Sequence, residues 1–214
     1  QQPFSWKSLG VDIRGRSRTL RVNYRTSHQI RSHADRLLGP EITDADGNVE
    51  ERNHTISAFN GSPPEVSLHT SPDEESAHVA AWVSTHLDNG ILPHEIGIFV
   101  RSEKEIPRAQ QAAAKAKLPV KILDQHIETA TGHAAIGTMH LAKGLEFRCV
   151  ATMACDEDIL PLQERIASIG DNTDLQEVYD TERHLLYVAC TRARDHLLVT
   201  GLEPGSEFLD DFVG

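Results

Sequence analysis

Long hydrophobic runs and cysteine pairs are both missing from this sequence. No apolar run approaches the roughly 20 residues that a membrane-spanning helix needs, so we expect no membrane partner. The three cysteines, Cys149, Cys155 and Cys190, form no CxxC pair, which argues against a disulfide scaffold or a cysteine zinc site and favours a reducing compartment. Residues 1–10 also lack the charged segment and apolar core of a secretory signal. We therefore expect a cytoplasmic protein.

Metal-ligand spacing and an initiating methionine are lacking as well. The chain has 12 histidines, but none forms HExxH or a pair four residues apart, the spacing that places two imidazoles on one helical face. We therefore expect scattered surface histidines and no metal-binding residue. Only Met139 and Met153 are present and the chain begins with Gln1, so we expect a piece of a longer polypeptide.

Charge is abundant but unevenly distributed along the 214 residues. The formal net charge is -11, yet residues 1–36 hold eight basic groups against two acids, whereas residues 155–182 hold nine acids against Arg165. The distribution of charge decides more about partners than its sum does. It is compatible with a local anion site near the start of the chain and excludes a broad DNA-coating surface.

Apolar and amphipathic segments alternate along the chain, which has an ordinary globular composition of 39% hydrophobic and 25% charged residues. The predicted strands are residues 18–22, 65–69, 96–101, 120–123, 136–140, 149–154 and 196–200. The predicted helices run from Thr26 or Ser27 to about Leu38, from Ser71 to about Asn89, from Ala109 to Lys117 and from Leu175 to Ala193. Residues 39–64 are expected to form a loop. This alternation predicts an α/β fold with a parallel sheet covered on both faces.

Three segments carry residue types that could do chemistry. They are residues 20–26, 138–147 and 182–194, and we expect them at the carboxyl ends of strands, where open parallel sheets place their working residues. Each segment alone has an ordinary structural explanation, such as an arginine pairing with a surface acid or favouring the dipole at a helix end. Only their combination points to a function.

The three segments, in this order, closely resemble motifs of the UvrD/Rep/PcrA-like superfamily 1 helicases. NYRT at 23–26 resembles motif IV, TMHLAKGLEF at 138–147 resembles motif V, and YVACTRA at 187–193 resembles motif VI. IGIFVRS at 96–102, with the later LPVKIL, resembles the family's segment after motif IV. The opening QQPFSWKSLG resembles the tail of motif III. The resemblance extends over nearly the whole chain.

This resemblance implies that residues 1–214 are the second RecA-like domain of a DNA helicase, a parallel sheet flanked by helices without its own P-loop. In such enzymes ATP lies in the cleft between two RecA-like domains. Carried over by motif, the catalytic residues that reach the γ-phosphate are Arg25 and Arg192. The residues implied to bind ATP are Tyr24, which would stack on adenine, Gly144, and Glu146, which would contact the ribose. Those implied to contact single-stranded DNA are Thr138, His140 and Arg101.

The parts that the sequence lacks complete this interpretation. There is no GxxxxGK[ST] loop and no acidic DExx strand end before residue 23, so the phosphate cradle, the Mg²⁺ ligands and the water-positioning acid are missing. The resemblance assigns them, with Mg²⁺, to a first RecA-like domain of the same polypeptide, and we expect no ATP hydrolysis by this chain alone. The family's large insert is also absent, since only residues 124–137 separate Leu123 from Thr138.

Two functions remain open from the sequence. The first is the carboxyl-terminal motor half of an ATP-dependent DNA helicase or translocase, with single-stranded DNA and the first RecA-like domain as partners. The second is a non-catalytic RecA-like module that binds DNA or another partner. A small-molecule α/β domain is excluded because no glycine-rich dinucleotide fingerprint follows any predicted strand. Polarity, DNA versus RNA preference, pathway and oligomeric state are undetermined.

Overall fold

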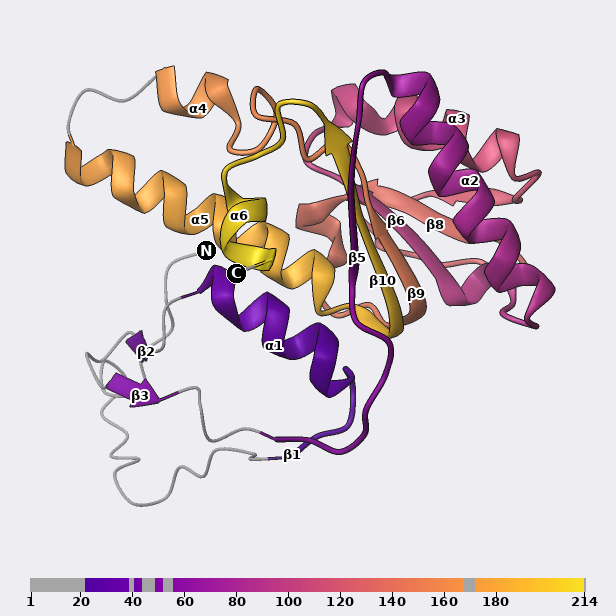
Figure 1. Cartoon of the computed structure of the whole chain (residues 1–214), viewed down its shortest axis with the longest axis horizontal. Helices are drawn as coiled ribbons and strands as arrows, with labels where there is room; N and C mark the ends of the chain where they lie inside the picture. Colours follow the sequence, from indigo (N-terminus) through magenta and orange to yellow (C-terminus); the bar gives the residue numbers. More distant parts are fainter. Residues whose placement is uncertain (1–21, 39–40, 44–48, 52–55, 168–171, 214) are drawn as a thin grey trace.

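Six parallel strands form the centre of the molecule, in the order β5-β10-β9-β6-β8-β7 (Figure 1). The computed structural model describes residues 22–38, 41–43, 49–51, 56–167 and 172–213. The strands are β5 (Glu65–His69), β6 (Ile96–Val100), β7 (Val120–Ile122), β8 (Ala134–Thr138), β9 (Phe147–Thr152) and β10 (Ala193–Leu202). The predicted parallel α/β sheet is therefore confirmed.

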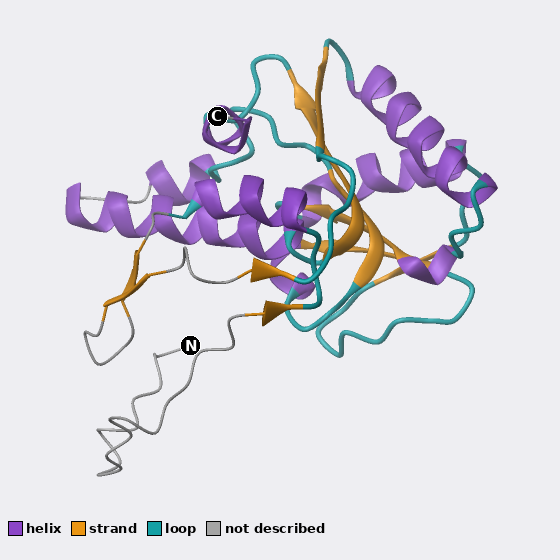
Figure 2. Ribbon diagram, turned by 60° about the horizontal axis from the view of Figure 1, so that its bottom comes forward, coloured by secondary structure: helices purple, strands orange, loops and turns teal. Residues whose placement is uncertain are grey.

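Helices cover both faces of this sheet, as the alternation of segments predicted (Figures 1 and 2). One face carries α1 (His28–Leu37), α5 (Asn172–Cys190) and α6 (Phe208–Val213), and the other carries α2 (Pro72–Asp88) and α3 (Ile106–Lys115). Successive strand residues point to opposite sides, so Val150 packs with the α1 and α5 side while Cys149 and Ala151 pack with the α2 and α3 side. Burial on both faces explains why these strands read as continuous apolar runs.

Two of the four predicted helix starts are confirmed by their caps. The Ser27 hydroxyl accepts a hydrogen bond from the amide of Ile30 at 3.5 Å at the start of α1. At the start of α2, the Ser71 hydroxyl accepts from the amide of Glu74 at 3.3 Å, and Pro72 occupies the first turn. The helix ends at Asp88, and Gly90 then takes a φ of 87°. These local signals were sufficient because caps depend on neighbours in the sequence.

Short elements that the sequence did not predict fill the connections. β1 (Val22–Asn23) pairs in parallel with β4 (Ile56–Ser57), and β2 (Glu41–Thr43) pairs antiparallel with β3 (Val49–Glu51) inside the region expected to be a loop. The other unpredicted elements are η3 (Pro93–Glu95), η4 (Glu103–Glu105), η5 (Met139–Ala142), α4 (Gln163–Ala167) and α6. The strand expected at 18–22 and the opening that resembles motif III lie outside the described residues, except for Val22.

Two boundary errors matter for the site. The strand expected to run to His140 ends at Thr138, where η5 begins. The helix expected to reach Ala193 ends at Cys190, because Ala193 already pairs with Phe147 in the sheet. Arg192 therefore lies in the short turn between α5 and β10. In the described part of the chain, no helix combines the length and apolar character needed to cross a membrane.

Candidate functional site

The candidate residues occupy two opposite edges of the sheet. Thr138 is the last residue of β8 and Arg101 follows the carboxyl end of β6, whereas Glu146 and Arg192 immediately precede the amino ends of β9 and β10. The expectation that all candidates lie at carboxyl ends is therefore wrong for Gly144, Glu146 and Arg192. The periodicity identified the strands, but it misplaced where β9 and β10 begin.

Three charged side chains from distant segments meet at the amino edge, and we call Arg25, Glu146 and Arg192 the amino-edge cluster. Arg25 forms an ion pair through Nε with Oε1 of Glu146, and both side chains are about half exposed, at 51% and 53%. The charges of both Arg25 and Glu146 act on the Arg192 guanidinium. The cluster thus brings together the residues of the segments resembling motifs IV, V and VI.

Arg192 is held by backbone carbonyls rather than by an acid. Its Nε donates to the carbonyl of Val188 at 2.9 Å, and Nη1 donates to the carbonyl of Leu145 at 3.4 Å. Burial lowers the pKa of Arg192 by desolvation, the nearby charge of Arg25 lowers it further, and Glu146 acts in the opposite direction. Two neighbouring guanidiniums with one carboxylate between them form a site that an anion would stabilise.

Backbone contacts fix the position of Arg25 relative to Arg192. The Thr26 hydroxyl donates to the carbonyl of Thr191 at 3.0 Å, and the amide of Ser27 donates to the carbonyl of Arg194 at 3.1 Å. These two contacts attach the start of α1 to the turn that carries Arg192. The geometry of the two arginines is therefore set by tertiary hydrogen bonds across about 165 residues of sequence.

Tyr24 lies next to Arg25 in the segment at 20–26, and Gly144 lies close to Glu146 in the segment at 138–147. The Tyr24 side chain is 75% exposed, so its ring is accessible to a flat ligand. Gly144 has a φ of 87°, in the left-handed region that glycine adopts without strain, and it lies between η5 and the start of β9. A turn of this kind explains the glycine beside Glu146 without requiring the glycine to touch a ligand.

A groove of about 720 Å³ lies at the carboxyl edge, beyond the ends of β6, β7 and β8. It contains all three residues expected to contact DNA. Its lining residues are Arg101, Ser102, Glu103, Leu123, Asp124, Gln125, His126, Thr138, His140 and Leu141. The lining offers hydroxyl, amide and imidazole groups and the carboxylates of Glu103 and Asp124, while its single arginine is paired. Recognition here would therefore depend on hydrogen bonds more than on positive charge.

Arg101 lines this groove but is not available to a ligand in this structure. Its side chain is 4% exposed, and two guanidinium nitrogens donate to the carboxylate of Glu182 at 2.5 Å each. Arg101 would have to leave Glu182 to contact DNA, so its expected role in DNA binding stays a prediction. Desolvation lowers the pKa of His140, and the positive charge of Arg101 lowers it further. Arg101 thus affects the groove through its charge, which acts on the His140 imidazole.

Sequence reasoning missed Glu182, which is fully buried. Burial alone would raise its pKa, but the hydrogen bonds and charge of Arg101 outweigh this and lower the pKa. A signal was present, because Glu182 falls on the inward stripe of α5 together with Leu186 and Ala189. An acid within an apolar stripe indicates a buried ion pair.

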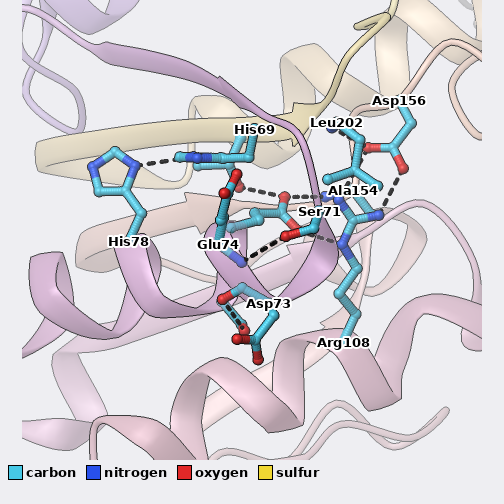
Figure 3. Close-up of polar contacts among 12 residues, drawn as sticks. His69, Ser71, Asp73, Glu74, His78, Arg108, Ala154, Asp156 and Leu202 are labelled. Atoms are coloured by element: carbon cyan, nitrogen blue, oxygen red, sulfur yellow. Dashed lines mark hydrogen bonds and ion pairs between the residues drawn. The ribbon is translucent and has the colours of Figure 1, made fainter.

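A second buried polar network ties α2 and α3 to the segment after β9 (Figure 3). Glu75, which has no exposed surface, accepts from the amide of Ala154 at 3.0 Å and from the Thr200 hydroxyl at 2.7 Å. Arg108 pairs with Glu75 and also reaches Asp156, with Nη1 2.6 Å from Oδ2. Its charges are satisfied internally, so this network is structural rather than a ligand site.

The next question is whether possible metal ligands lie together among the described residues. No group of three or more histidine, cysteine, aspartate or glutamate side chains among them is arranged to hold a metal ion. All three cysteines are buried, and desolvation raises the pKa of Cys149 and of Cys190 to about 12. These thiols are therefore unreactive core residues.

Comparison with known proteins links these sites to one family. Residues 126–203 match the family described as UvrD-like helicase C-terminal domain. Over 77 residues the chain is 39% identical to ATP-dependent DNA helicase UvrD1 of Mycobacterium leprae (strain TN), covering 36% of this chain and 9% of that protein. Over 63 residues it is 46% identical to ATP-dependent DNA helicase PcrA of Staphylococcus aureus (strain MRSA252), covering 29% of this chain and 8% of that protein.

A solved structure supports the fold over a longer stretch. The C-terminal domain of a possible DNA helicase from Lactobacillus plantarum WCFS1 superposes with a TM-score of 0.61 at 18% identity, covering 89% of this chain and 94% of that one. This likeness concerns the fold alone, and it agrees with the RecA-like parallel sheet. The family match includes Thr138, Gly144, Glu146 and Arg192, because all lie within residues 126–203. Residues 126–203 are thus similar to the C-terminal domain of UvrD-like helicases, and the fold of the described chain agrees with that similarity.

Proposed function

We propose that this chain is the second motor domain of a longer polypeptide that acts as an ATP-dependent DNA helicase or translocase. The observation that carries the proposal is the amino-edge cluster, in which Arg25, Glu146 and Arg192 meet from three distant segments. The relatives similar to part of this chain are ATP-dependent DNA helicases, which supports the same activity. We call the polypeptide that contains both motor domains the complete polypeptide.

The cluster suits the stabilisation of a transferring phosphoryl group. Phosphoryl transfer requires positioning and charge neutralisation more than covalent chemistry, and guanidiniums offer fixed planar donors to phosphate oxygens. Arg192 is preset by its carbonyl contacts, whereas Arg25 must exchange Glu146 for the γ-phosphate. Glu146 is then released, which leaves its carboxylate available to a ribose hydroxyl.

Tyr24 and the first motor domain complete the nucleotide site in this proposal. The exposed ring of Tyr24 can stack on the adenine of ATP. Mg²⁺ would be held with ATP by the first motor domain, where it neutralises charge on the β- and γ-phosphates. Because both arginines come from this chain, hydrolysis would require the two domains to close on ATP.

The groove at the carboxyl edge is the proposed contact with single-stranded DNA. Thr138 and His140 lie in it beside Ser102 and Gln125, so uncharged donors can meet the sugar and bases of a strand. The segment from Thr138 to Phe147 continues from this groove, through η5 and Gly144, to the amino-edge cluster. A displacement of DNA bound in the groove would therefore be transmitted to Glu146 through the few residues between His140 and Glu146.

The test is ATP hydrolysis by the complete polypeptide, with and without single-stranded DNA. Arg192→Ala is expected to lower kcat by about 10³-fold or more, the effect of removing an arginine finger in related chemistry. Arg183→Ala is the matched control, because Arg183 lies on α5, the helix that ends just before Arg192, but pairs with Asp211 of α6. The control is expected to keep at least half of the activity, and circular dichroism checks folding of both variants.

The outcomes separate the two functions that the sequence left open. Unchanged turnover in Arg192→Ala would mean that the arginine has no role in the chemistry. No turnover by the unsubstituted complete polypeptide would favour a non-catalytic module that binds DNA or a partner.

A further inference from the structure

Four hydrogen bonds from three parts of the fold converge on the buried carboxylate of Glu182. From the end of β6, Arg101 donates to both carboxylate oxygens at 2.5 Å. Nη1 of Arg165 in α4 donates at 3.0 Å, and the amide of Leu162 donates at 3.2 Å. Glu182 itself lies on α5 with no exposed surface. It is therefore the common anchor of α4, α5 and the rim of the groove.

An ionic anchor of this kind is not needed for packing alone. Burying a carboxylate costs several kcal/mol before pairing, and apolar replacements of whole buried ion pairs are often equally stable. Glu182 lies in line with Leu186 and Ala189, so an apolar side chain would extend the stripe of α5 without a break. The charge of Glu182 therefore has a purpose other than core stability. The position of its partners indicates that purpose.

The partners of Glu182 connect it to the groove. Arg101 lines the groove with Thr138 and His140. The charges of Arg101, Glu182 and Arg165 all act on the His140 imidazole. A negatively charged strand entering the groove would compete with Glu182 for the Arg101 guanidinium. Because Arg165 already bonds to the same carboxylate, Glu182 keeps a partner when Arg101 is drawn away.

The helix that carries Glu182 also leads to Arg192. From Glu182 to the end of α5 at Cys190 the helix axis extends about 12 Å, and Arg192 follows in the turn. Within that last part, the carbonyl of Val188 accepts from the Arg192 guanidinium at 2.9 Å. A shift of α5 at Glu182 is therefore transmitted along one rigid element to the acceptor that sets the orientation of Arg192.

We propose that Glu182 is a positioning residue that couples occupation of the groove by single-stranded DNA to the setting of Arg192 at the far end of α5. This inference rests on the proposed function and adds the route by which DNA stimulates hydrolysis. Glu182 touches neither DNA nor nucleotide. Its role is to hold Arg101 and α5 in one arrangement when the groove is empty and to release Arg101 when it is filled.

The test compares Glu182→Gln with the unsubstituted complete polypeptide in ATP hydrolysis without DNA and with saturating single-stranded oligodeoxythymidylate. Glutamine keeps an acceptor for the Leu162 amide but removes the charge. Stimulation by DNA is expected to fall about tenfold, within the 5- to 150-fold range typical of coupling between sites. The rate without DNA is expected to stay within about twofold, and Glu182→Asp, which restores the charge, is expected to recover part of the stimulation.

Glu177→Gln is the matched control, because Glu177 is an exposed acid on the same helix. Equal stimulation in Glu182→Gln and the unsubstituted protein would overturn the inference. So would an equal loss of both rates with a lower Tm, since that pattern marks a purely structural role. If Glu182→Gln does not fold, Arg101→Lys replaces it, because lysine removes the bidentate contact with Glu182 but keeps the positive charge. Undiminished stimulation by DNA in Arg101→Lys would overturn the inference too.

Failure of the proposed function gives a different result from failure of this inference. An unsubstituted complete polypeptide without any turnover would remove the proposed function and the inference together. If the unsubstituted polypeptide hydrolyses ATP and DNA stimulates Glu182→Gln to the same extent, only the inference is removed.

Discussion

At the scale of single residues, the charged side chains of this chain differ in how tightly they are held. Arg192 is fixed by carbonyls, and Arg101 is locked onto Glu182 in the interior. Arg25 and Glu146, by contrast, form a half-exposed pair, and such pairs contribute little to stability. Arg25, which is proposed to exchange Glu146 for the γ-phosphate, thus leaves a pairing that costs little to break.

Two partly buried histidines, His86 on α2 and His69 at the end of β5, provide a prediction at the same scale. Desolvation and the neighbouring His196 lower the pKa of His86, and desolvation with His78 lowers the pKa of His69. The unfolded chain therefore binds more protons than the folded one just below pH 6.5. Stability is expected to be complete above pH 6.5 and to decrease as the pH falls through the lower folded-state pKa values.

Chemical denaturation between pH 7.5 and 5 measures this effect. His86→Gln is expected to flatten the decline, because glutamine carries no proton to gain. His94→Gln is the control, since His94 is an exposed histidine on η3. A decline that is as steep in His86→Gln as in the unsubstituted chain would rule out His86 as its source.

At the scale of elements, the two layers of helices perform different tasks. α1 and α5 carry or adjoin the residues of the amino-edge cluster, and α5 also carries Glu182. α2 and α3 carry the buried network of Glu75 and Arg108, whose partners are all within the protein (Figure 3). The layer of α2 and α3 therefore acts as a support for the carboxyl ends of β9 and β10.

This support can be tested at Arg108. Arg108→Ala leaves the fully buried carboxylate of Glu75 without its cation, and breaking a buried pair in this way costs about 3–5 kcal/mol. We expect a correspondingly lower free energy of unfolding, measured by urea denaturation. Lys104→Ala is the control, because its pair with Glu164 is exposed and should contribute nothing measurable. The double variant Glu75→Gln with Arg108→Met should regain part of the loss, and equal stability of Arg108→Ala and the unsubstituted chain would contradict the prediction.

At the scale of the whole molecule, the sheet presents one candidate site at each edge. The groove uses the carboxyl ends of β6, β7 and β8, and the amino-edge cluster uses the starts of β9 and β10. Residues 138–147 belong to both. A domain built in this way can relate a strand at one edge to a nucleotide at the other, but its cluster supplies only the arginine side of a nucleotide site.

The prediction at this scale is that residues 1–214 alone do not hydrolyse ATP, because the sequence has no phosphate loop and no DExx strand end before residue 23. The purified chain is measured with single-stranded DNA and Mg²⁺, alongside Arg25→Ala and Arg192→Ala to reveal contaminating activity. DNA-stimulated turnover that both substitutions abolish would contradict the prediction.

The sequence by itself determined the main strands and helices of the sheet and the motifs. Caps at Ser27 and Ser71 and the apolar runs of β6 and β9 depend on neighbouring residues, so local patterns were sufficient for them. The tertiary structure alone decided which edge each candidate occupies, that Arg25 pairs with Glu146, and that Arg101 is sealed against Glu182. The reason is physical: strand register and buried ion pairs depend on contacts between residues far apart in sequence, which no local pattern encodes.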